Sequence, residues 1–370
     1  MFRKLIRKKN KFLGDLKTNF TKLLFDKKNN NIFNEAKISQ INKVVFLRHD
    51  NKIGDMIVST FAYREMKKAN PNLNISVIAG PNTVSIIENN TNVDKTFVFP
   101  SPHSLIKIIR IGKTLQKEKF DLYIDLDEKV SWKTIFLLWL IKPKFALGFN
   151  REKYKSYNLN IPFDFDLNHK IEHYKRVFEV LNLKISDTNY DIFIPENISE
   201  TVISFLKSLP ENRKNIVINP FGASKHRWMN FEQIEKIATE FSNCNIIIIG
   251  LENDLKKFLM NKKLHSNIFI PAIENYNIFH SFIIIKNCDF VITVDTSILH
   301  SAVAFQKPLV GLYIGTENKN TNMNIWGPGP NAKKNQIVLS GENSFDIFEI
   351  SPDKIIAAIK KLFDNEDQNE

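Results

Sequence analysis

The sequence predicts an α/β protein made of two domains, each with a doubly wound parallel sheet. Short apolar runs alternate with helical segments from about residue 42 onward, and such runs are typical of strands covered on both faces. The alternation restarts near residue 216, after a connecting region. The length of 370 residues, with 43% hydrophobic residues, is sufficient for two cores of ordinary size.

The first series of elements begins with an apolar run at 44–47 and is followed by a helix over 55–69. Further strands are expected at 75–79, 96–99, 122–126 and 145–149, with helices over 104–118, 131–141 and 169–181. The longest apolar run, Ile135 to Ile141, suits a buried helix. It is far shorter than the roughly 20 apolar residues that span a membrane.

The second series repeats the same alternation. Strands are expected at 216–219, 246–249, 268–270, 290–294 and 309–314, with helices over 230–241, 253–263, 275–286 and 297–305. We therefore expect an N-terminal domain over 41–185 and a C-terminal domain over 186–350, preceded by a basic segment over 1–40 and followed by a helix and acidic tail over 351–370. In doubly wound sheets ligands bind at the carboxyl ends of the strands, so a cleft between the two domains is the expected site.

The positive charge is concentrated at the N-terminus. The formal net charge is +12, and residues 1–30 contain ten Lys or Arg against two acidic residues. At 100° per residue the apolar residues of this segment fall in one arc of about 120°. Two interpretations remain open: residues 1–28 lie on an anionic membrane surface, or they form a helix that packs on its own protein. A nucleic-acid partner is not expected, because no recognition motif accompanies the charge.

Several other classes of site are not indicated. The N-terminus lacks the apolar core of a secretory signal, and the two cysteines, Cys244 and Cys288, cannot build a disulfide framework or a cysteine zinc site. We expect both thiols to stay reduced in the cytoplasm. His169 and His173 have a spacing that zinc can use, but no acidic residue of the zinc-protease kind lies between them, so we predict no metal site.

The first chemically informative segment, Arg48 to Asp55, joins a predicted strand to a predicted helix. Gly54 permits a close backbone approach, and Asp55 lies near the helix start. Asp55 can cap backbone amides or act as a general base directed into the cleft. The segment lacks the Gly-x-Gly-x-x-Gly pattern of dinucleotide-binding proteins.

A second segment, Asn219 to Trp228, also follows a predicted strand. Its small residues stand beside Lys225, His226 and Arg227, and this combination suits a phosphate-bearing ligand. An ordinary loop with surface cations is the alternative. No Walker lysine motif is present, so triphosphate hydrolysis is not indicated.

The third segment, Val294 to His300, places Asp-Thr-Ser where a strand ends and a helix begins. Free backbone amides and the helix dipole favour an anion at such a point. Thr296 and Ser297 add hydroxyl donors, while Asp295 can accept from sugar hydroxyls. Plain helix capping, with His300 packed in the interior, is the alternative.

Taken in order, these segments resemble the lipopolysaccharide heptosyltransferase family, glycosyltransferase family 9. The resemblance runs from about residue 42 to 360. It rests on Arg48 to Thr60, Asn219 to Ala223 with Arg227-Trp228, Val294 to Ala304 with Lys307-Pro308, and Trp326-Gly327-Pro328.

The resemblance implies a GT-B fold, with two Rossmann-like domains facing each other across a cleft. It implies an inverting, metal-independent transferase without a cofactor, which moves a heptose from ADP-heptose to the lipid-linked inner core of lipopolysaccharide. The acceptor would be held mainly by the first domain and the donor by the second. Such an enzyme is expected in the cytoplasm, peripheral at the inner face of the inner membrane. Asp55 matches the catalytic aspartate of the family.

We therefore divide the candidate site residues into two groups beside the expected base Asp55. The donor group is Asn219, Gly222, Ser224, Lys225, Arg227, Glu252, Asp295, Thr296, Ser297 and His300. The acceptor group is Arg48, Gly54, Arg110, Lys113 and Arg151.

The chain departs from the family pattern at a few positions. It has Thr60-Phe61 where a proline is usual, Ser297 where a glycine is usual, and His226 where a cation commonly stands two residues before the tryptophan. The cation that binds the diphosphate and the identity of the sugar therefore stay open. Three other functions also stay open: a transferase of this fold with another nucleotide sugar or a protein acceptor, a non-catalytic glycan- or nucleotide-binding relative, and a nucleotide-sugar epimerase.

Overall fold

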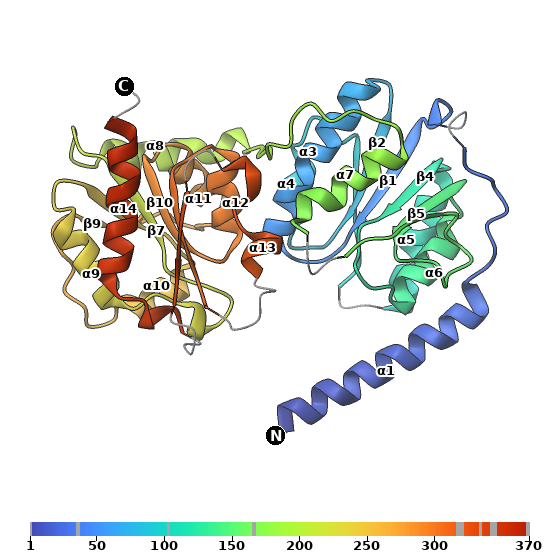
Figure 1. Cartoon of the computed structure of the whole chain (residues 1–370), viewed down its shortest axis with the longest axis horizontal. Coiled ribbons are helices and arrows are strands. Elements are labelled where there is room, and N and C mark those ends of the chain that lie inside the picture. The colour runs from blue at the N-terminus through green and yellow to red at the C-terminus, as the bar shows by residue number, and fades with distance from the viewer. Residues whose placement is uncertain are drawn as a thin grey trace. The chain divides into compact units, whose positions relative to one another are not determined.

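The computed structural model describes residues 2–34, 38–101, 104–164, 168–315, 322–332, 335–340 and 346–367 (Figure 1). The chain divides into two compact units. Unit 1 comprises Met1–Phe165 and Ile171–Asp187, and unit 2 comprises Asp166–Lys170 and Thr188–Glu370. Each unit is built around its own parallel sheet.

Unit 1 contains, within the described ranges, a six-stranded sheet in the order β3-β2-β1-β4-β5-β6. All neighbouring strands pair in parallel. The strands are β1 (Lys43–Arg48), β2 (Asn74–Ala79), β3 (Lys95–Val98), β4 (Leu122–Asp125), β5 (Phe145–Phe149) and β6 (Leu159–Ile161). The order 3-2-1-4-5-6 is that of the Rossmann fold, whose ligand crevice lies where β1 and β4 diverge.

Helices cover both faces of this sheet, as Figure 1 shows. They are α3 (Ile53–Ala69), α4 (Val84–Glu88), α5 (Leu105–Glu118), α6 (Trp132–Ile141) and α7 (Lys170–Val180), while α1 (Phe2–Phe25) packs on α6. On one face Val45 and Tyr123 belong to a core shared with α5 and α6. On the other, the ring of Phe61 from α3 lies 5.5 Å from that of Tyr174 from α7.

The apolar run Ile135–Ile141 forms most of α6, whose residues Ile135 to Leu138 and Ile141 are buried. Burial in a protein core explains why so short a helix is so apolar. Among the helices in the described part of the chain, none combines the length and the apolarity needed to cross a bilayer.

Unit 2 repeats the topology of unit 1. Its described strands form a six-stranded parallel sheet in the order β12-β11-β10-β7-β8-β9. They are β7 (Asn215–Asn219), β8 (Asn245–Ile248), β9 (Ile268–Phe269), β10 (Phe290–Val294), β11 (Leu309–Tyr313) and β12 (Asn335–Leu339). Numbered from its own first strand, this sheet again reads 3-2-1-4-5-6 from its β9 edge. The predicted α/β class with two doubly wound sheets is confirmed.

The helices of unit 2 also lie on both faces of its sheet. They are η1 (Glu196–Ile198), α8 (Ser199–Lys207), η2 (Lys225–Arg227), α9 (Phe231–Glu240), α10 (Glu252–Leu259), α11 (Ile278–Lys286), α12 (Ser297–Ala304), α13 (Asn322–Trp326), η3 (Gly329–Asn331), η4 (Ile347–Glu349) and α14 (Pro352–Asp367). Helix α14 packs on α9 and β12. It continues through the first residues of the expected acidic tail, whose last residues, 368–370, lie outside the described ranges.

The chain passes from unit 1 to unit 2 between Asp187 and Thr188, and the unit 1 side of this junction is fixed by Glu65 of α3. One carboxylate oxygen of Glu65 accepts hydrogen bonds from the amide of Ser186 at 2.6 Å and from its hydroxyl at 2.7 Å. The amide of Asp187 donates to the same oxygen at 3.3 Å. Burial acts to raise the pKa of Glu65, but hydrogen bonds from Lys68 and Ser186 outweigh it and lower that pKa to about 2.

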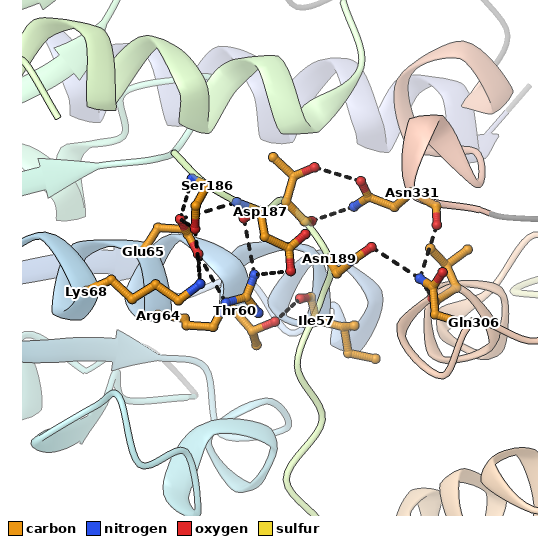
Figure 2. A network of polar contacts seen from close by, with 12 residues as sticks. Ile57, Thr60, Arg64, Glu65, Lys68, Ser186, Asp187, Asn189, Gln306 and Asn331 are labelled. Carbon is orange, nitrogen blue, oxygen red and sulfur yellow. Dashed lines mark hydrogen bonds and ion pairs between the residues drawn. The ribbon is translucent and has the colours of Figure 1, made fainter. Parts of the chain in front are cut away.

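The unit 2 side is fixed by amide side chains, which Figure 2 also shows. The hydroxyl of Thr188 donates to Asn331 Oδ1 at 2.7 Å, and Asn331 Nδ2 donates back to the Thr188 carbonyl at 2.5 Å. Gln306 Nε2 donates to Asn189 Oδ1 at 3.2 Å. Each end of this junction is therefore held by its own unit.

Replacing Glu65 by Gln should weaken the hydrogen bonds that hold Ser186 and Asp187 to α3. The amides of Ser186 and Asp187 should lose protection in hydrogen exchange. The unfolding free energy measured with urea should fall by about 1.5–3 kcal/mol, the usual value of hydrogen bonds to a charged group. Glu88→Gln, at an exposed position of α4, is the control and should change neither quantity. Unchanged protection at 186 and 187 would contradict the anchoring role.

Candidate active site

The first polar group of the site lies where β1 ends and α3 begins. The Arg48 guanidinium, on the last residue of β1, has its Nη2 atom 2.7 Å from Asp55 Oδ2 and 3.4 Å from Asp50 Oδ2. Lys52 Nζ lies 3.8 Å from the same Asp55 oxygen. The N-cap of α3 is Lys52 rather than Asp55. The capping interpretation of Asp55 is therefore wrong, because its carboxylate is held by Arg48.

The Asp55 carboxylate is buried, with 7% of the residue exposed. Burial raises the pKa of Asp55 to about 6; the charge of Arg48 acts against this rise and that of Asp50 adds to it. A carboxylate with such a pKa is ionised at neutral pH and is a stronger base than an exposed aspartate. The position therefore combines a carboxylate that Arg48 holds in place with raised basicity.

A second ionic pair lies beside the first, at the end of the neighbouring strand β4. Leu47 is in register with Asp125, which brings the loop after β4 next to the loop after β1. There His49 Nδ1 lies 3.2 Å from Asp127 Oδ2. Burial acts to lower the pKa of His49, but the Asp127 carboxylate outweighs it and raises that pKa. The sequence analysis did not assign this pair, because its only signal is that both residues follow adjacent strands.

Two of the residues expected to contact the acceptor are buried, and this corrects the expectation. Arg48 is 3% exposed and Arg151 is 2% exposed. Arg151 Nη2 lies 3.2 Å from Asp125 Oδ2, and its guanidinium donates to the carbonyls of Phe149 and Asp127. Both arginines are enclosed by unit 1 and pair with its carboxylates, so they support the two loops instead of presenting a charge to solvent.

The remaining acceptor candidates differ in exposure. Arg110 and Lys113 lie on the exposed face of α5, where either could meet an anionic ligand. Gly54 is buried in the first turn of α3.

The second polar group belongs to unit 2 and lies where β7 and β10 run side by side. Asn219, the last residue of β7, donates from Nδ2 to Thr293 Oγ1 at 3.0 Å and to Thr296 Oγ1 at 2.9 Å. Thr296 is the N-cap of α12 and accepts from the amide of Ile298 at 3.3 Å. The half-buried Ser297 follows as the first residue of α12. Asn219 thereby fixes the helix N-terminus that the sequence predicted as an anion site.

Arg227 reaches the same edge of the sheet from the loop after β7. Its Nη1 atom lies 3.1 Å from Asp295 Oδ2, with about a third of the arginine side chain exposed. Gly222 allows this loop to fold closely, since a Cβ there would lie 2.5 Å from Arg227 Cβ and 2.6 Å from the Arg227 carbonyl oxygen. The indole of Trp228 donates to the Gly222 carbonyl at 2.9 Å. The loop thus presents a held but accessible guanidinium.

The other donor candidates lie at the surface. Ser224 and Lys225 are exposed. His226, also exposed, contacts the Asp346 carboxylate, so its ring is engaged away from Asp295. Glu252 is exposed at the first turn of α10 and pairs with Lys256 Nζ at 2.5 Å. Of the three adjacent residues Lys225, His226 and Arg227, Arg227 is the one that the structure brings to Asp295.

His300 lies in the second turn of α12 and is 4% exposed. Burial lowers its pKa to about 3, with a further contribution from the charge of His169, so the ring is neutral at physiological pH. Its Nδ1 atom has no hydrogen-bond partner among the described residues. The rings of Tyr190 and Trp326 lie 6.3 and 6.4 Å from it.

The histidine pair considered as a metal site does not form one helical face. Helix α7 begins at Lys170, after His169, and His169 Nε2 contacts the Gly327 carbonyl at 3.2 Å. His173 is buried with its ring 3.8 Å from that of Phe149. Among the residues that the structure describes, no group of three or more His, Cys, Asp or Glu could hold a metal ion.

Comparison with known proteins decides the family. The profile of glycosyltransferase family 9 (heptosyltransferase) matches residues 108–350, more than half of the chain. The chain belongs to glycosyltransferase family 9. The resemblance predicted from the three motifs is confirmed, and the protein is a glycosyltransferase.

Relatives of this family 9 enzyme include the protein named "Putative lipopolysaccharide heptosyltransferase 4" of Escherichia coli K12, 27% identical over 96% of both chains. Another is lipooligosaccharide heptosyltransferase 2 of Haemophilus influenzae, 25% identical over 73% of this chain and 82% of that protein.

Solved structures of family 9 share the fold of this chain. The family 9 transferase from Veillonella parvula superposes with a TM-score of 0.74 at 18% identity, covering 87% of this chain and 97% of that one. The ADP-heptose heptosyltransferase II of E. coli superposes with a TM-score of 0.69 at 16% identity, covering 88% and 99%. The expected GT-B fold is therefore confirmed.

Replacing Gly222 by Ala in this family 9 enzyme should push apart residues 222 and 227, which approach each other within the loop after β7. We expect a loss of about 1–3 kcal/mol in unfolding free energy, the usual cost of inserting a methyl group into a packed position. Urea unfolding measures the effect. Ala223→Ser, at the exposed neighbouring position, should be neutral. A Gly222→Ala variant as stable as the parent would show that the loop relaxes without the close approach.

Proposed function

We propose that this glycosyltransferase moves a heptose from ADP-heptose to the inner core of lipopolysaccharide, with inversion at the anomeric carbon. The names of its relatives, which describe lipopolysaccharide and lipooligosaccharide heptosyltransferases, support this assignment. The observation that carries the proposal is the buried Asp55 carboxylate, held 2.7 Å from Arg48 at the end of β1.

Asp55 acts as the general base on the acceptor in this mechanism. It takes the proton from the acceptor hydroxyl while that oxygen attacks the anomeric carbon, and the bond from that carbon to the diphosphate breaks on the opposite face. One proton moves to Asp55, one glycosidic bond forms and ADP leaves. A base of this kind contributes about a hundred- to ten-thousand-fold in rate. Arg48 holds the carboxylate in place and keeps it ionised.

Unit 2 supplies the groups that bind the donor and the leaving diphosphate. Negative charge develops on that group as it departs, and the free amides at Thr296 and Ser297 with Arg227 and Lys225 are suited to stabilise it. In this proposal those donors do so without a metal ion. Asp295 orients sugar hydroxyls, His300 supports that end of α12, and Glu252 is a candidate contact for the nucleoside. Transfer requires that acceptor and donor meet during turnover.

The proposed acceptor is attached to lipid and carries acidic groups. Arg110 and Lys113 are the exposed cations of unit 1 that we assign to such groups. An acceptor of this kind is presented by a bilayer, so we place the enzyme in the cytoplasm, peripheral at the inner face of the inner membrane.

Replacing Asp55 by Asn should lower kcat/KM for transfer from ADP-heptose to a truncated core acceptor by about 10²- to 10⁴-fold, because the base is lost while the shape is kept. Product formation is read by mass spectrometry. For the parent enzyme kcat/KM should fall about tenfold per pH unit below the Asp55 pKa of about 6, because only the ionised carboxylate accepts the proton.

Titration with ADP provides the control for Asp55→Asn, and the affinity should equal that of the parent because unit 2 is unchanged. An Asp55→Asn variant that transfers heptose at the parental rate would exclude Asp55 as the base. Binding of ADP without transfer by the parent would instead favour a non-catalytic relative, and turnover of the nucleotide sugar without acceptor would favour an epimerase.

The donor assignment is tested by calorimetric titration with ADP and UDP. We expect ADP to bind more tightly, and Arg227→Gln to weaken ADP binding by about tenfold or more, because one charged hydrogen bond to the diphosphate is lost. Arg213→Gln, at an exposed position of unit 2, is the matched control and should leave the affinity unchanged. Preference for UDP would indicate another sugar donor. If the Arg227→Gln variant binds ADP as tightly as the parent, the diphosphate contact would be assigned to Lys225 or His226 instead.

A further inference from the structure

We propose that α1 docks on an anionic lipid bilayer through an apolar stripe, which we define as Phe12, Leu13, Leu16, Phe20, Leu23 and Leu24. This inference deepens the membrane localisation included in the proposed function by naming the surface that makes the contact. It stands on the packing of α1 and not on the chemistry of transfer.

The apolar stripe is exposed along its whole described length. Phe12 is 67% exposed, Leu16 57%, Phe20 63% and Leu23 78%, while Leu13 and Leu24 at its edges are 41% and 43% exposed. The spacing 12, 16, 20, 23 follows one face of a helix. A contiguous apolar surface of this kind marks an interaction site in a folded protein.

The opposite face of α1 packs on its own protein. The half-buried or buried residues there are Gly14, Thr18, Thr21 and Phe25, and α1 lies against α6. The Phe25 ring lies 4.9 Å from that of Phe136 and 4.8 Å from that of Trp139. Surface helices normally turn their apolar face to the core. Helix α1 does the reverse: it packs on its own protein, as one of the two interpretations expected, but through the face opposite the apolar stripe, which stays exposed.

The end of α1 is fixed so that the stripe stays turned outward. The Asp26 carboxylate accepts from the amide of Lys155 at 3.0 Å and from the amide of Ser156 at 2.9 Å. The Ser156 hydroxyl donates to Asp26 Oδ1 at 2.7 Å, and Lys22 Nζ lies 4.7 Å from the centre of the Tyr154 ring. Such an anchor lowers the ordering cost of docking, because the helix is already formed and oriented.

The charge of the segment identifies the occupant as an anionic bilayer. Residues 1–30 contain ten Lys or Arg and two acidic residues, and Lys9 and Lys17 of α1 are exposed. Apolar residues with surrounding cations are the combination that interfacial helices use on anionic lipids. A symmetric contact with a second copy would bring these cations against the same cations. Since the helix is not apolar enough to span a bilayer, it lies on the surface.

The test is co-sedimentation of the full chain with vesicles of phosphatidylglycerol and phosphatidylethanolamine, and with vesicles of phosphatidylcholine alone. The parent should bind the anionic vesicles, bind the neutral ones far less, and lose binding as salt is raised. The double variant Leu16→Gln/Phe20→Gln should bind the anionic vesicles at least about tenfold more weakly, because two exposed apolar side chains of the stripe are lost.

The matched control is Leu251→Gln/Met260→Gln, which removes two side chains of unit 2 that are 64% and 68% exposed, and it should bind like the parent. Both variants should keep the parental circular dichroism and the parental rate on a soluble truncated acceptor, so failure of docking is distinguishable from failure of the transferase proposal. A parent that ignores anionic vesicles, or a stripe variant that binds as well as the parent, overturns the inference. A parental dimer that the stripe variant converts to monomer, with vesicle binding unchanged, would reassign the stripe to self-association.

Discussion

The arrangement of unit 1 depends on one buried ion pair, between Arg48 and Asp55. Neither charge is stable alone at this burial, because an isolated ion in a protein interior loses several kcal/mol of hydration. Paired at 2.7 Å, they fix the loop that joins β1 to α3. Tyr174 of α7 and Tyr63 of α3 lie near enough to Arg48 for their pKa values to respond to its charge. Helix α7 therefore helps to enclose the site, which thus depends on a segment more than a hundred residues further along the chain.

The two units use the same position in the same topology for different purposes. Arg48 and Asn219 are each the last residue of the first strand of their sheet, beside the fourth strand where a doubly wound sheet diverges. In unit 1 that residue is a cation and holds a carboxylate. In unit 2 it is a neutral amide that holds Thr296, the N-cap of α12. A neutral support adds no charge of its own at the positive end of the helix dipole, which suits an anionic diphosphate.

Element types were predictable, because a buried parallel strand and the helix that covers it have different periodicities. The strands that sequence reasoning left out show where this signal fails. Strand β6 has only three residues, one of them buried, and β12 lies at the edge of its sheet, where its apolar run is limited to the last three residues of Asn335–Leu339. Both are strands because a neighbouring strand offers hydrogen bonds, a tertiary cause that local composition does not carry.

The residue types of the candidate site were predictable from the sequence. Which of its cations are buried and which are exposed was not. Arg48, Arg110, Lys113 and Arg151 are equivalent cations in the sequence, and surface exposure is the usual expectation for such residues. The fold separates them: Arg48 and Arg151 are enclosed with carboxylates, whereas Arg110 and Lys113 remain exposed.

The same distinction applies to α1, whose amphipathic pattern says that one face is apolar but not which face is covered. Thr21 is 7% exposed while Leu23 is 78% exposed. Hydropathy alone predicts the opposite, with the threonine exposed and the leucine buried. Because the face of α1 that packs on unit 1 carries Thr18 and Thr21 while the apolar stripe is exposed, we assign the stripe to an external partner. The nearby cations then determine the class of that partner, because they favour anionic lipid over another copy of themselves.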